Sequence, residues 1–191
     1  MLNAHHRGRI ELLFILLLCA VPVVAAYIAL NLWQPQQGTV NYGELLPPRP
    51  LPDAAVPSLD GRVFRMSDLR GKWVLLQVDS AACDQNCRQK LYYLRQARLT
   101  QGKDMQRIER VWIIDDNGAP QQDVTKEYAG TWLIRGAGSA LLAALPAVNS
   151  PKDHVYLVDP KGNLMLRFPR NADPRKMVKD ITRLLKVSQI G

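Results

Sequence analysis

Residues 73–99 read WVLLQVDSAACDQNCRQKLYYLRQARL. The first seven residues are a dense apolar run, which is typical of a central strand covered on both faces. Residues 88–99 lack Gly and Pro, and Leu91 and Leu94 stand at helical spacing. The stretch therefore predicts a buried strand, a short loop and a helix that begins at a pair of cysteines, Cys83 and Cys87.

The segments on either side extend an α/β pattern. Upstream, Asp60-Gly61 lies between short alternating segments and predicts a hairpin. Downstream, apolar runs alternate with helical patterns. The expected strands are 110–115, 131–135, 154–159 and 164–168, and the expected helices are 120–128, 139–145 and one that starts at Asp173 and Pro174. This order predicts a mixed sheet flanked by helices, with a parallel part that the strand–helix–strand crossovers produce.

The N-terminal region predicts a membrane anchor. The run from Leu12 to Leu30 carries no charge, and at ~1.5 Å per residue a helix of this length covers the roughly 30 Å hydrocarbon core of a bilayer. Arg7 and Arg9 precede the run, while the next basic residue after it is Arg49. The positive-inside bias therefore places the N-terminus in the cytoplasm and the rest of the chain outside.

This pattern divides the chain into four parts. We expect a cytoplasmic tail at 1–11, a transmembrane anchor at 12–33, a Pro-rich linker at 34–54 and one domain at 55–191. The expected location is the bacterial inner (cytoplasmic) membrane, crossed once, with the C-terminal domain in the periplasm. A cleaved signal peptide is the alternative interpretation of the apolar run. Cys19 lies within that run and is interpreted as an apolar filler.

Composition narrows the class of protein. The chain of 191 residues is 47% hydrophobic and 22% charged, which argues against a disordered chain. Its three cysteines are too few for a disulfide-dense scaffold. A net charge of +8 invites a nucleic-acid partner, but the basic residues beyond the span are spread along the exported part, apart from a basic last helix. We therefore expect no nucleic acid.

Cys83 and Cys87 are the candidate reactive residues. Residues four apart at the start of a helix lie on one face, so both sulfurs can point at one spot. A helix N-terminus stabilises negative charge and so favours the thiolate, which attacks disulfides and binds metals. Two thiolates suit Cu(I) or zinc. A structural disulfide is the alternative, since exported compartments are oxidising, although so small a loop contributes little stability.

A third metal ligand can be sought by elimination. The chain has three histidines, and His5 and His6 belong to the expected cytoplasmic tail. His154 is the histidine of the exported domain, and it opens the strand expected at 154–159. In this topology the strand entrance is expected near the cysteine loop, which makes His154 a predicted metal ligand. A histidine that is merely hydrogen-bonded in a loop is the alternative.

Two segments resemble a known family. The segment DGRVFRMSDLRGKWVLLQVDSAACDQNC (60–87) and the later YLVDPKGNL (156–164) are similar to the thioredoxin-like Sco/SenC proteins, which are membrane-anchored copper chaperones and thiol–disulfide reductases of cytochrome c oxidase assembly. The resemblance covers roughly residues 53–187. It implies a thioredoxin-like fold and copper as the bound metal, with Cys83, Cys87 and His154 as its ligands. Asp84 stands where the family usually has Pro, and His154 stands about three residues later than the family histidine.

Three functions follow from these patterns. The first is a copper-binding assembly factor that supplies a copper centre of cytochrome c oxidase. The second is a thiol–disulfide oxidoreductase in which Cys83 attacks and Cys87 resolves the mixed disulfide, with both cysteines catalytic. The third is a non-catalytic thioredoxin-like interaction module whose cysteines form only a disulfide. The expected partner is a cytochrome c oxidase subunit, a cytochrome or another assembly factor.

Overall fold

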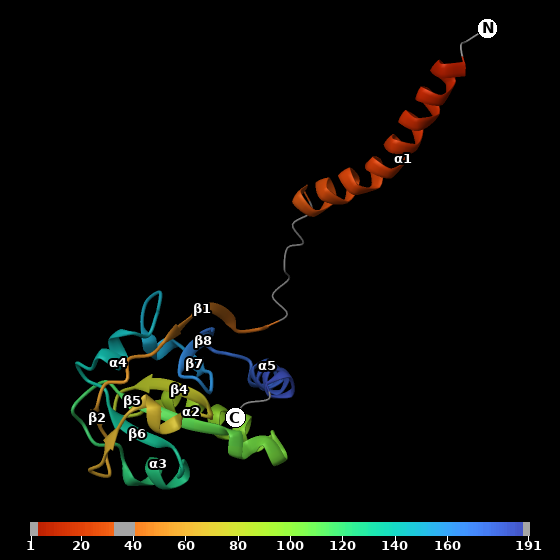
Figure 1. Cartoon of the computed structure of the whole chain (residues 1–191). Helices are drawn as coiled ribbons and strands as arrows, with labels where there is room; N and C mark the ends of the chain where they lie inside the picture. Colours follow the sequence, from red (N-terminus) through yellow and green to blue (C-terminus); the bar gives the residue numbers. More distant parts are fainter. Residues whose placement is uncertain (1–3, 33–40, 189–191) are drawn as a thin grey trace. The chain divides into compact units, whose positions relative to one another are not determined.

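The computed structural model describes residues 4–32 and 41–188, which form two units. The first unit is a single helix, α1 (Ala4–Leu32), in which Gly8–Ile28 is long and apolar enough to cross a membrane (Figure 1). The side chains of residues 8–28 are exposed within the unit, so their apolar surface is available to lipid. The prediction of one N-terminal helix with the length and composition of a span is confirmed.

The second unit is built on a sheet of six strands. Their order across the sheet is β1 (Glu44–Pro50), β8 (Asn163–Phe168), β7 (Val155–Val158), β4 (Trp73–Asp79), β5 (Ile108–Ile114) and β6 (Trp132–Arg135). Strands β4, β5 and β6 run parallel, whereas β7, β8 and β1 are joined by antiparallel pairing. All seven residues of β4 are buried, which agrees with the apolar run that predicted a central strand.

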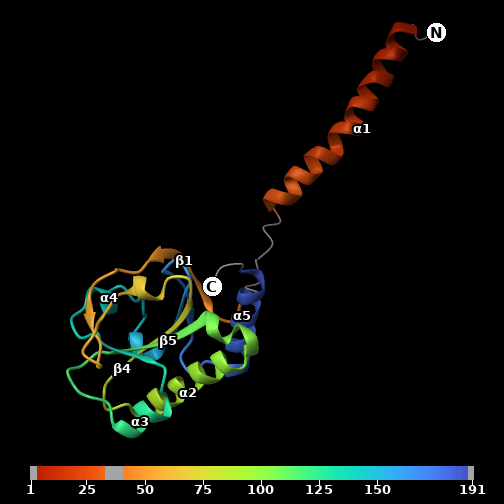
Figure 2. The same ribbon diagram turned by 60° about the horizontal axis from the view of Figure 1, so that its bottom comes forward.

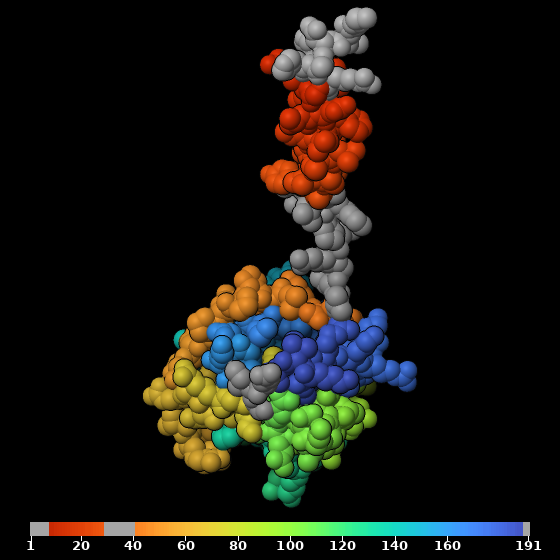
Figure 3. Space-filling view, turned by 45° about the vertical axis from the view of Figure 1, so that its right-hand side comes forward, coloured from red at the N-terminus to blue at the C-terminus, as the bar shows by residue number. Residues whose placement is uncertain are grey.

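Helices cover the two faces of this sheet unequally. One face packs against α2 (Gln85–Leu99), α3 (Gln122–Glu127) and α5 (Pro174–Val187). The other face packs against α4 (Ala140–Ala143), the short 3-10 helix η1 (Met66–Leu69) and a hairpin of β2 (Val56–Pro57) and β3 (Val63–Phe64). Figure 2 shows α2 and α5 together and α4 on the opposite side of the domain, and α5 lies beside α2 on the surface in Figure 3.

Local signals in the sequence account for the boundaries of these elements. Asp173 caps α5 by accepting hydrogen bonds from the N–H groups of Arg175 and Lys176, and Pro174 fills the first helical position. The Asp60-Gly61 turn closes the β2–β3 hairpin, with Gly61 at φ 85°. Two more 3-10 turns, η2 (Gly102–Arg107) and η3 (Pro151–Asp153), lead into β5 and β7. The predicted mixed sheet flanked by helices is confirmed.

The predicted linker differs from the structure at its C-terminal part. Glu44–Pro50 lies within the expected spacer 34–54, yet it forms β1 and pairs with β8. Prolines are tolerated there because an edge strand needs backbone donors on one side only. The hydroxyl of Tyr42 accepts a hydrogen bond from the N–H of Asp173, and the Gly43 N–H donates to Asp180 at 2.9 Å. The sheet domain therefore begins at residue 41 and not at 55, and residues 33–40 lie outside the described part.

Gly43 tests whether this entry segment belongs to the domain. A Cβ on Gly43 would lie 2.1 Å from Leu166 Cδ2 in the buried sheet. We therefore predict that Gly43→Ala lowers the free energy of unfolding by about 1–3 kcal/mol, because side chains must shift to admit the methyl group. Urea unfolding followed by Trp fluorescence measures this, with the half-exposed Leu45→Ala on β1 as the matched control. An unchanged midpoint for Gly43→Ala would show that residues 41–50 are only a spacer.

Candidate functional site

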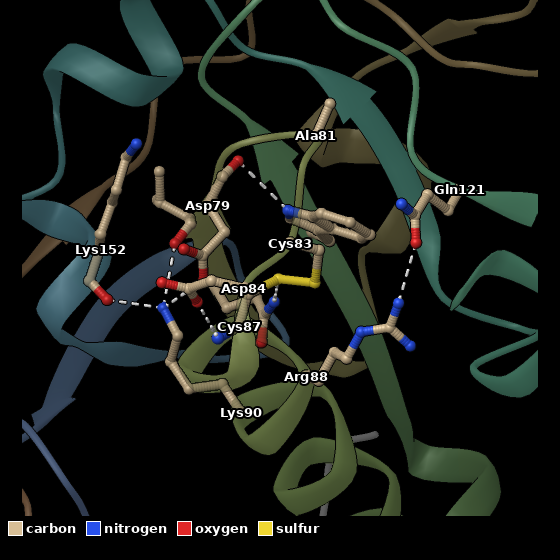
Figure 4. Close-up of a disulfide and its surroundings, with 12 residues drawn as sticks. Asp79, Ala81, Cys83, Asp84, Cys87, Arg88, Lys90, Gln121 and Lys152 are labelled. Carbon is tan, nitrogen blue, oxygen red and sulfur yellow. Dashed lines mark hydrogen bonds and ion pairs between the residues drawn. A yellow bond between two sulfur atoms is a disulfide. The ribbon is translucent and has the colours of Figure 1, made fainter. Parts of the chain in front are cut away.

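Cys83 and Cys87 lie where the central strand β4 passes into α2, and a disulfide joins them (Figure 4). A turn precedes the helix, in which the Cys83 N–H donates to the Ser80 carbonyl at 3.1 Å. Cys83 has φ 43°, a left-handed conformation that is uncommon for a residue with a Cβ. Asp84 is the N-cap of α2, and its carboxylate accepts the Cys87 N–H at 2.9 Å. The departure from the family's Pro at this position thus supplies a helix cap.

Both sulfurs are shielded from solvent. Cys83 is 2% exposed and Cys87 is 0% exposed. They belong to an apolar cluster whose other buried members come from β5, α2, α3 and the loops next to them, namely Ala81, Leu91, Trp112, Ile114, Val124 and Tyr128. An incoming thiol or metal ion therefore reaches the pair only after covering side chains move.

A buried ion pair holds the start of α2 against the end of β4. Lys90 Nζ lies 2.5 Å from Asp79 Oδ2 and also donates to the carbonyl oxygens of Val78 and Lys152 (Figure 4). Asp79 is 6% exposed and Lys90 is 8% exposed. Burial raises the pKa of the Asp79 carboxyl, and the neighbouring Lys90 ammonium opposes part of that rise. The Asp79–Lys90 pair is thus buried, and two backbone carbonyls give the ammonium group additional acceptors, which helps an internal ion pair to be tolerated.

A second polar group inside the apolar region faces the sulfurs. Gln77 is 0% exposed in β4, and its Nε2 lies 3.8 Å from Cys87 Sγ. Its Oε1 has no hydrogen-bond partner among the described residues. Gln77 is the only amide side chain in this strand, so its place beside the disulfide is a specific feature of the site.

An exposed contact links α2 to the segment that leads into α3. Arg88 donates to Gln121 Oε1 at 3.0 Å (Figure 4) and to Asp123 Oδ2 at 3.1 Å. The Asp123 contact holds the pKa of that carboxyl below its usual value, chiefly through the Arg88 hydrogen bond. Because Val124 of α3 packs in the cysteine cluster, this contact ties down part of the cover over the disulfide.

The structure does not bring His154 together with the cysteines. His154 precedes β7 in extended conformation, with the register pairing Val155 to Gln77. Gln77 points to the cysteine side, so alternation turns the His154 side chain to the other face, where its ring contacts Tyr156 edge-on at 5.9 Å. Its Nδ1 lies 2.9 Å from the Phe168 carbonyl oxygen. The chain segment does approach β4, as expected, but the imidazole does not face the sulfurs.

The described residues contain no group of three His, Cys, Asp or Glu side chains that could hold a metal ion. The soft donors at this site are therefore the two cysteine sulfurs, which become available as thiolates after reduction. No role was predicted from the sequence for the polar residues around the sulfurs, which are Gln77, Asp79, Arg88 and Lys90. A signal for Lys90 existed, because it shares a helical face with Cys87, Leu91 and Leu94.

A parallel β4–β5–β6 unit followed by the antiparallel β7–β8 hairpin, with a cysteine pair at the start of the helix after β4, defines a thioredoxin-fold protein. Residues 73–188 match the family model described as "Transmembrane-like, thioredoxin-like, C-terminal domain". The chain belongs to that family. No curated protein matches the chain.

Solved structures with the same fold include copper-binding proteins and a disulfide isomerase. Copper-bound yeast Sco1 superposes with a TM-score of 0.60 at 20% identity, covering 75% of this chain and 96% of that one. Copper-bound Arabidopsis thaliana ScoI gives 0.59 at 17% identity, covering 73% and 100%. A putative protein disulfide isomerase from Bacteroides thetaiotaomicron gives 0.56 at 20% identity, covering 75% and 92%. At these identities the likeness establishes a thioredoxin-like fold.

A substitution of Lys90 tests how much the buried ion pair with Asp79 contributes to stability. Lys90→Met leaves the Asp79 carboxylate buried without its counter-charge, so we predict a loss of about 3 kcal/mol in the free energy of unfolding at pH 7. The folded-state pKa of Asp79 is already raised and rises further in this variant. As the pH falls through that pKa the carboxyl takes up a proton, and the destabilisation relative to wild type shrinks.

Denaturant unfolding at pH 7 and at about pH 4.5 measures this difference. Lys152→Met is the control, because Lys152 pairs with Asp115 at 2.9 Å from a more exposed position and its removal has a smaller cost. A Lys90→Met penalty that is equal at both pH values would contradict the assignment of a buried, ionised Asp79.

A substitution of Arg88 tests whether its contact with α3 restricts access to the disulfide. Arg88→Ala releases α3 from α2, so we predict that a soluble reductant such as dithiothreitol reduces the disulfide about two- to fivefold faster, because an exposed contact contributes a small part of the opening free energy. The rate of reduction is measured by alkylating the free thiols at a series of times and counting the alkylated cysteines by mass spectrometry. Gln89→Ala is the control, since Gln89 is exposed on α2 and its side chain bonds to Tyr93 of the same helix. Equal rates for wild type and Arg88→Ala would rule out this contact as a restraint.

Proposed function

We propose that this protein is a membrane-anchored, Sco-like assembly factor that binds Cu(I) through the reduced Cys83–Cys87 pair and supplies it to a copper centre of cytochrome c oxidase. The observation that carries the proposal is the convergence of two cysteine sulfurs at the start of α2 on a Sco-like fold. Copper is the cargo here and not a resident cofactor. The partner is an oxidase subunit or another assembly factor.

The chemistry of the donors supports copper in its reduced state. Thiolates are soft ligands that favour Cu(I). A disulfide sulfur is not a thiolate, so loading requires that two electrons first break the bond between Cys83 and Cys87. The apolar cluster around the pair would then keep water away from the bound ion. His154, expected from the sequence as a third ligand, contacts Phe168 and Tyr156 in this structure, and the site as proposed does not depend on it.

The remaining features agree with this assignment. Yeast Sco1 and Arabidopsis ScoI, which share the fold, have been solved with copper bound. The helix α1 has the length and composition of a span, and the charges that flank it favour a cytoplasmic N-terminus with the domain in the periplasm of a bacterium. Such a compartment is where a tethered copper donor would meet the exposed part of an oxidase.

A thiol–disulfide oxidoreductase is the second candidate, and the disulfide itself favours it. Cys83 and Cys87 are bonded to each other, and a reversible pair of this kind can pass two electrons to a client disulfide. Cys83 precedes the N-cap of α2 and is 2% exposed against 0% for Cys87, so it is the proposed attacking residue, with Cys87 resolving the mixed disulfide. The putative disulfide isomerase with the same fold is consistent with this activity. One dithiol can serve both functions.

Copper titration of the reduced full chain in detergent tests the first function. Cys19→Ser serves as the background, because Cys19 is a free cysteine outside the site. We predict one Cu(I) per chain in this background. We predict a loss of more than about 100-fold in affinity for Cys83→Ser and for Cys87→Ser, since even loss of a group that only orients a ligand costs ~10- to 100-fold. His154→Ala should retain the binding.

The outcomes separate the three functions. Copper binding that does not depend on the cysteines would contradict the copper proposal, and a large loss in His154→Ala would show that the imidazole reaches the metal. If copper does not bind but Cys87→Ser accumulates a mixed disulfide with a client, the oxidoreductase function holds. If neither occurs, the domain is an interaction module with a structural disulfide.

A further inference from the structure

We propose that Gln77 is a positioning residue that shifts the Cys83–Cys87 pair toward its dithiol form. Gln77 interrupts the apolar run of β4 on the face that carries Trp73 and Leu75, and it is fully buried. A buried amide is costly unless both of its polar atoms find partners. A state of the neighbouring sulfur that offers this amide a better partner is therefore favoured.

The disulfide state does not satisfy this amide. Gln77 Nε2 lies 3.8 Å from Cys87 Sγ, a contact with a weak acceptor. Gln77 Oε1 has no partner within the described residues. A sulfur in a disulfide carries no hydrogen, so it cannot donate to this oxygen. The oxidised protein thus carries the desolvation cost of one unpaired carbonyl oxygen beside the site.

Reduction changes what Cys87 offers. Two molecules of glutathione supply two electrons and two protons, the bond between the Cys83 and Cys87 sulfurs breaks, each sulfur gains a hydrogen, and glutathione disulfide is released. The Cys87 thiol is then a weak donor next to the Gln77 amide. The thiol sulfur can accept from Nε2, as the disulfide sulfur does, or, after rotation of the amide about its last side-chain bond, it can donate its S–H to Oε1.

The dithiol can therefore pair with either polar atom of the amide, whereas the disulfide can pair with Nε2 alone, and this favours the dithiol. Because a stability difference between the two forms is a difference in reduction potential, Gln77 raises the potential of the pair and makes it easier to reduce. The inference deepens the proposed function, since only a pair that cycles between the two states uses such a bias. It does not depend on which metal or client the dithiol serves.

The test compares glutathione redox equilibria of the metal-free full chain in detergent, in the Cys19→Ser background. Gln77→Met and Gln77→Leu both remove the amide while keeping a side chain of similar size. We predict that each lowers the equilibrium constant for reduction by about tenfold, which corresponds to a potential ~30 mV more negative. Alkylation of free thiols followed by mass spectrometry gives the fraction reduced at each glutathione ratio.

Two controls separate this effect from packing. Leu75→Met changes an apolar side chain on the same face of β4, and it should leave the equilibrium constant within about twofold. Denaturant unfolding of both redox forms should show that the Gln77 variants change the stability of the disulfide form and the dithiol form unequally. A change that is equal in both forms, a change below twofold, or a shift toward the dithiol would overturn the proposal.

A measurement on the wild-type protein tests the proposal even if neither Gln77 variant folds. Nuclear magnetic resonance of ¹⁵N-labelled glutamine side chains reports the Gln77 amide directly. We predict that its resonances shift on reduction, because its hydrogen bonding changes, and unchanged resonances would overturn the proposal. Failure of copper binding in the titration above would leave these results unaffected, so the two proposals fail separately.

Discussion

The contact between Lys90 and Asp79 fixes where the reactive pair can lie. Lys90 comes from the first turns of α2 and reaches the carboxyl end of β4, where one ammonium group serves the Asp79 carboxylate and two backbone carbonyls. With the helix held there, Asp84 caps its first turn, and both cysteines lie over the end of the central strand. The same ammonium bonds to the segment that leads into β7, so the parallel and antiparallel parts of the sheet meet at this point.

The burial of the Cys83 and Cys87 sulfurs conflicts with the access that their reactions require. The apolar cluster stabilises the domain and excludes water from the sulfurs, yet thiol exchange and metal transfer both need access to them. The cover from α3 is short and is held partly by an exposed contact from Arg88, so it is the weaker side of the enclosure. The start of α2 is held by the buried Lys90–Asp79 ion pair, so we expect it to move less readily than α3. We therefore expect access to the sulfurs to open at α3, with the start of α2 kept in place.

Much of the fold could be predicted because its patterns are local. The seven-residue apolar run of β4 and the Asp173-Pro174 start of α5 each carry their signal within a few residues. The edge strand β1 could not be recognised in the same way, since its prolines are typical of a spacer and its pairing with β8 joins distant segments. The side chain of His154 depends on strand register, which reverses the face of every residue when it shifts by one position. Spacing along the sequence placed the cysteines correctly at a helix start, but it could not show what surrounds them.

The central claim is that Cys83 and Cys87 form a reversible pair and not a structural disulfide. The most direct measurement is the reduction potential of the pair in the metal-free full chain, obtained by equilibration with glutathione buffers. We predict a potential above about −300 mV, within the range in which cellular dithiols can exchange with the pair. A potential well below that value would mark a structural disulfide and would contradict a reversible Cys83–Cys87 pair.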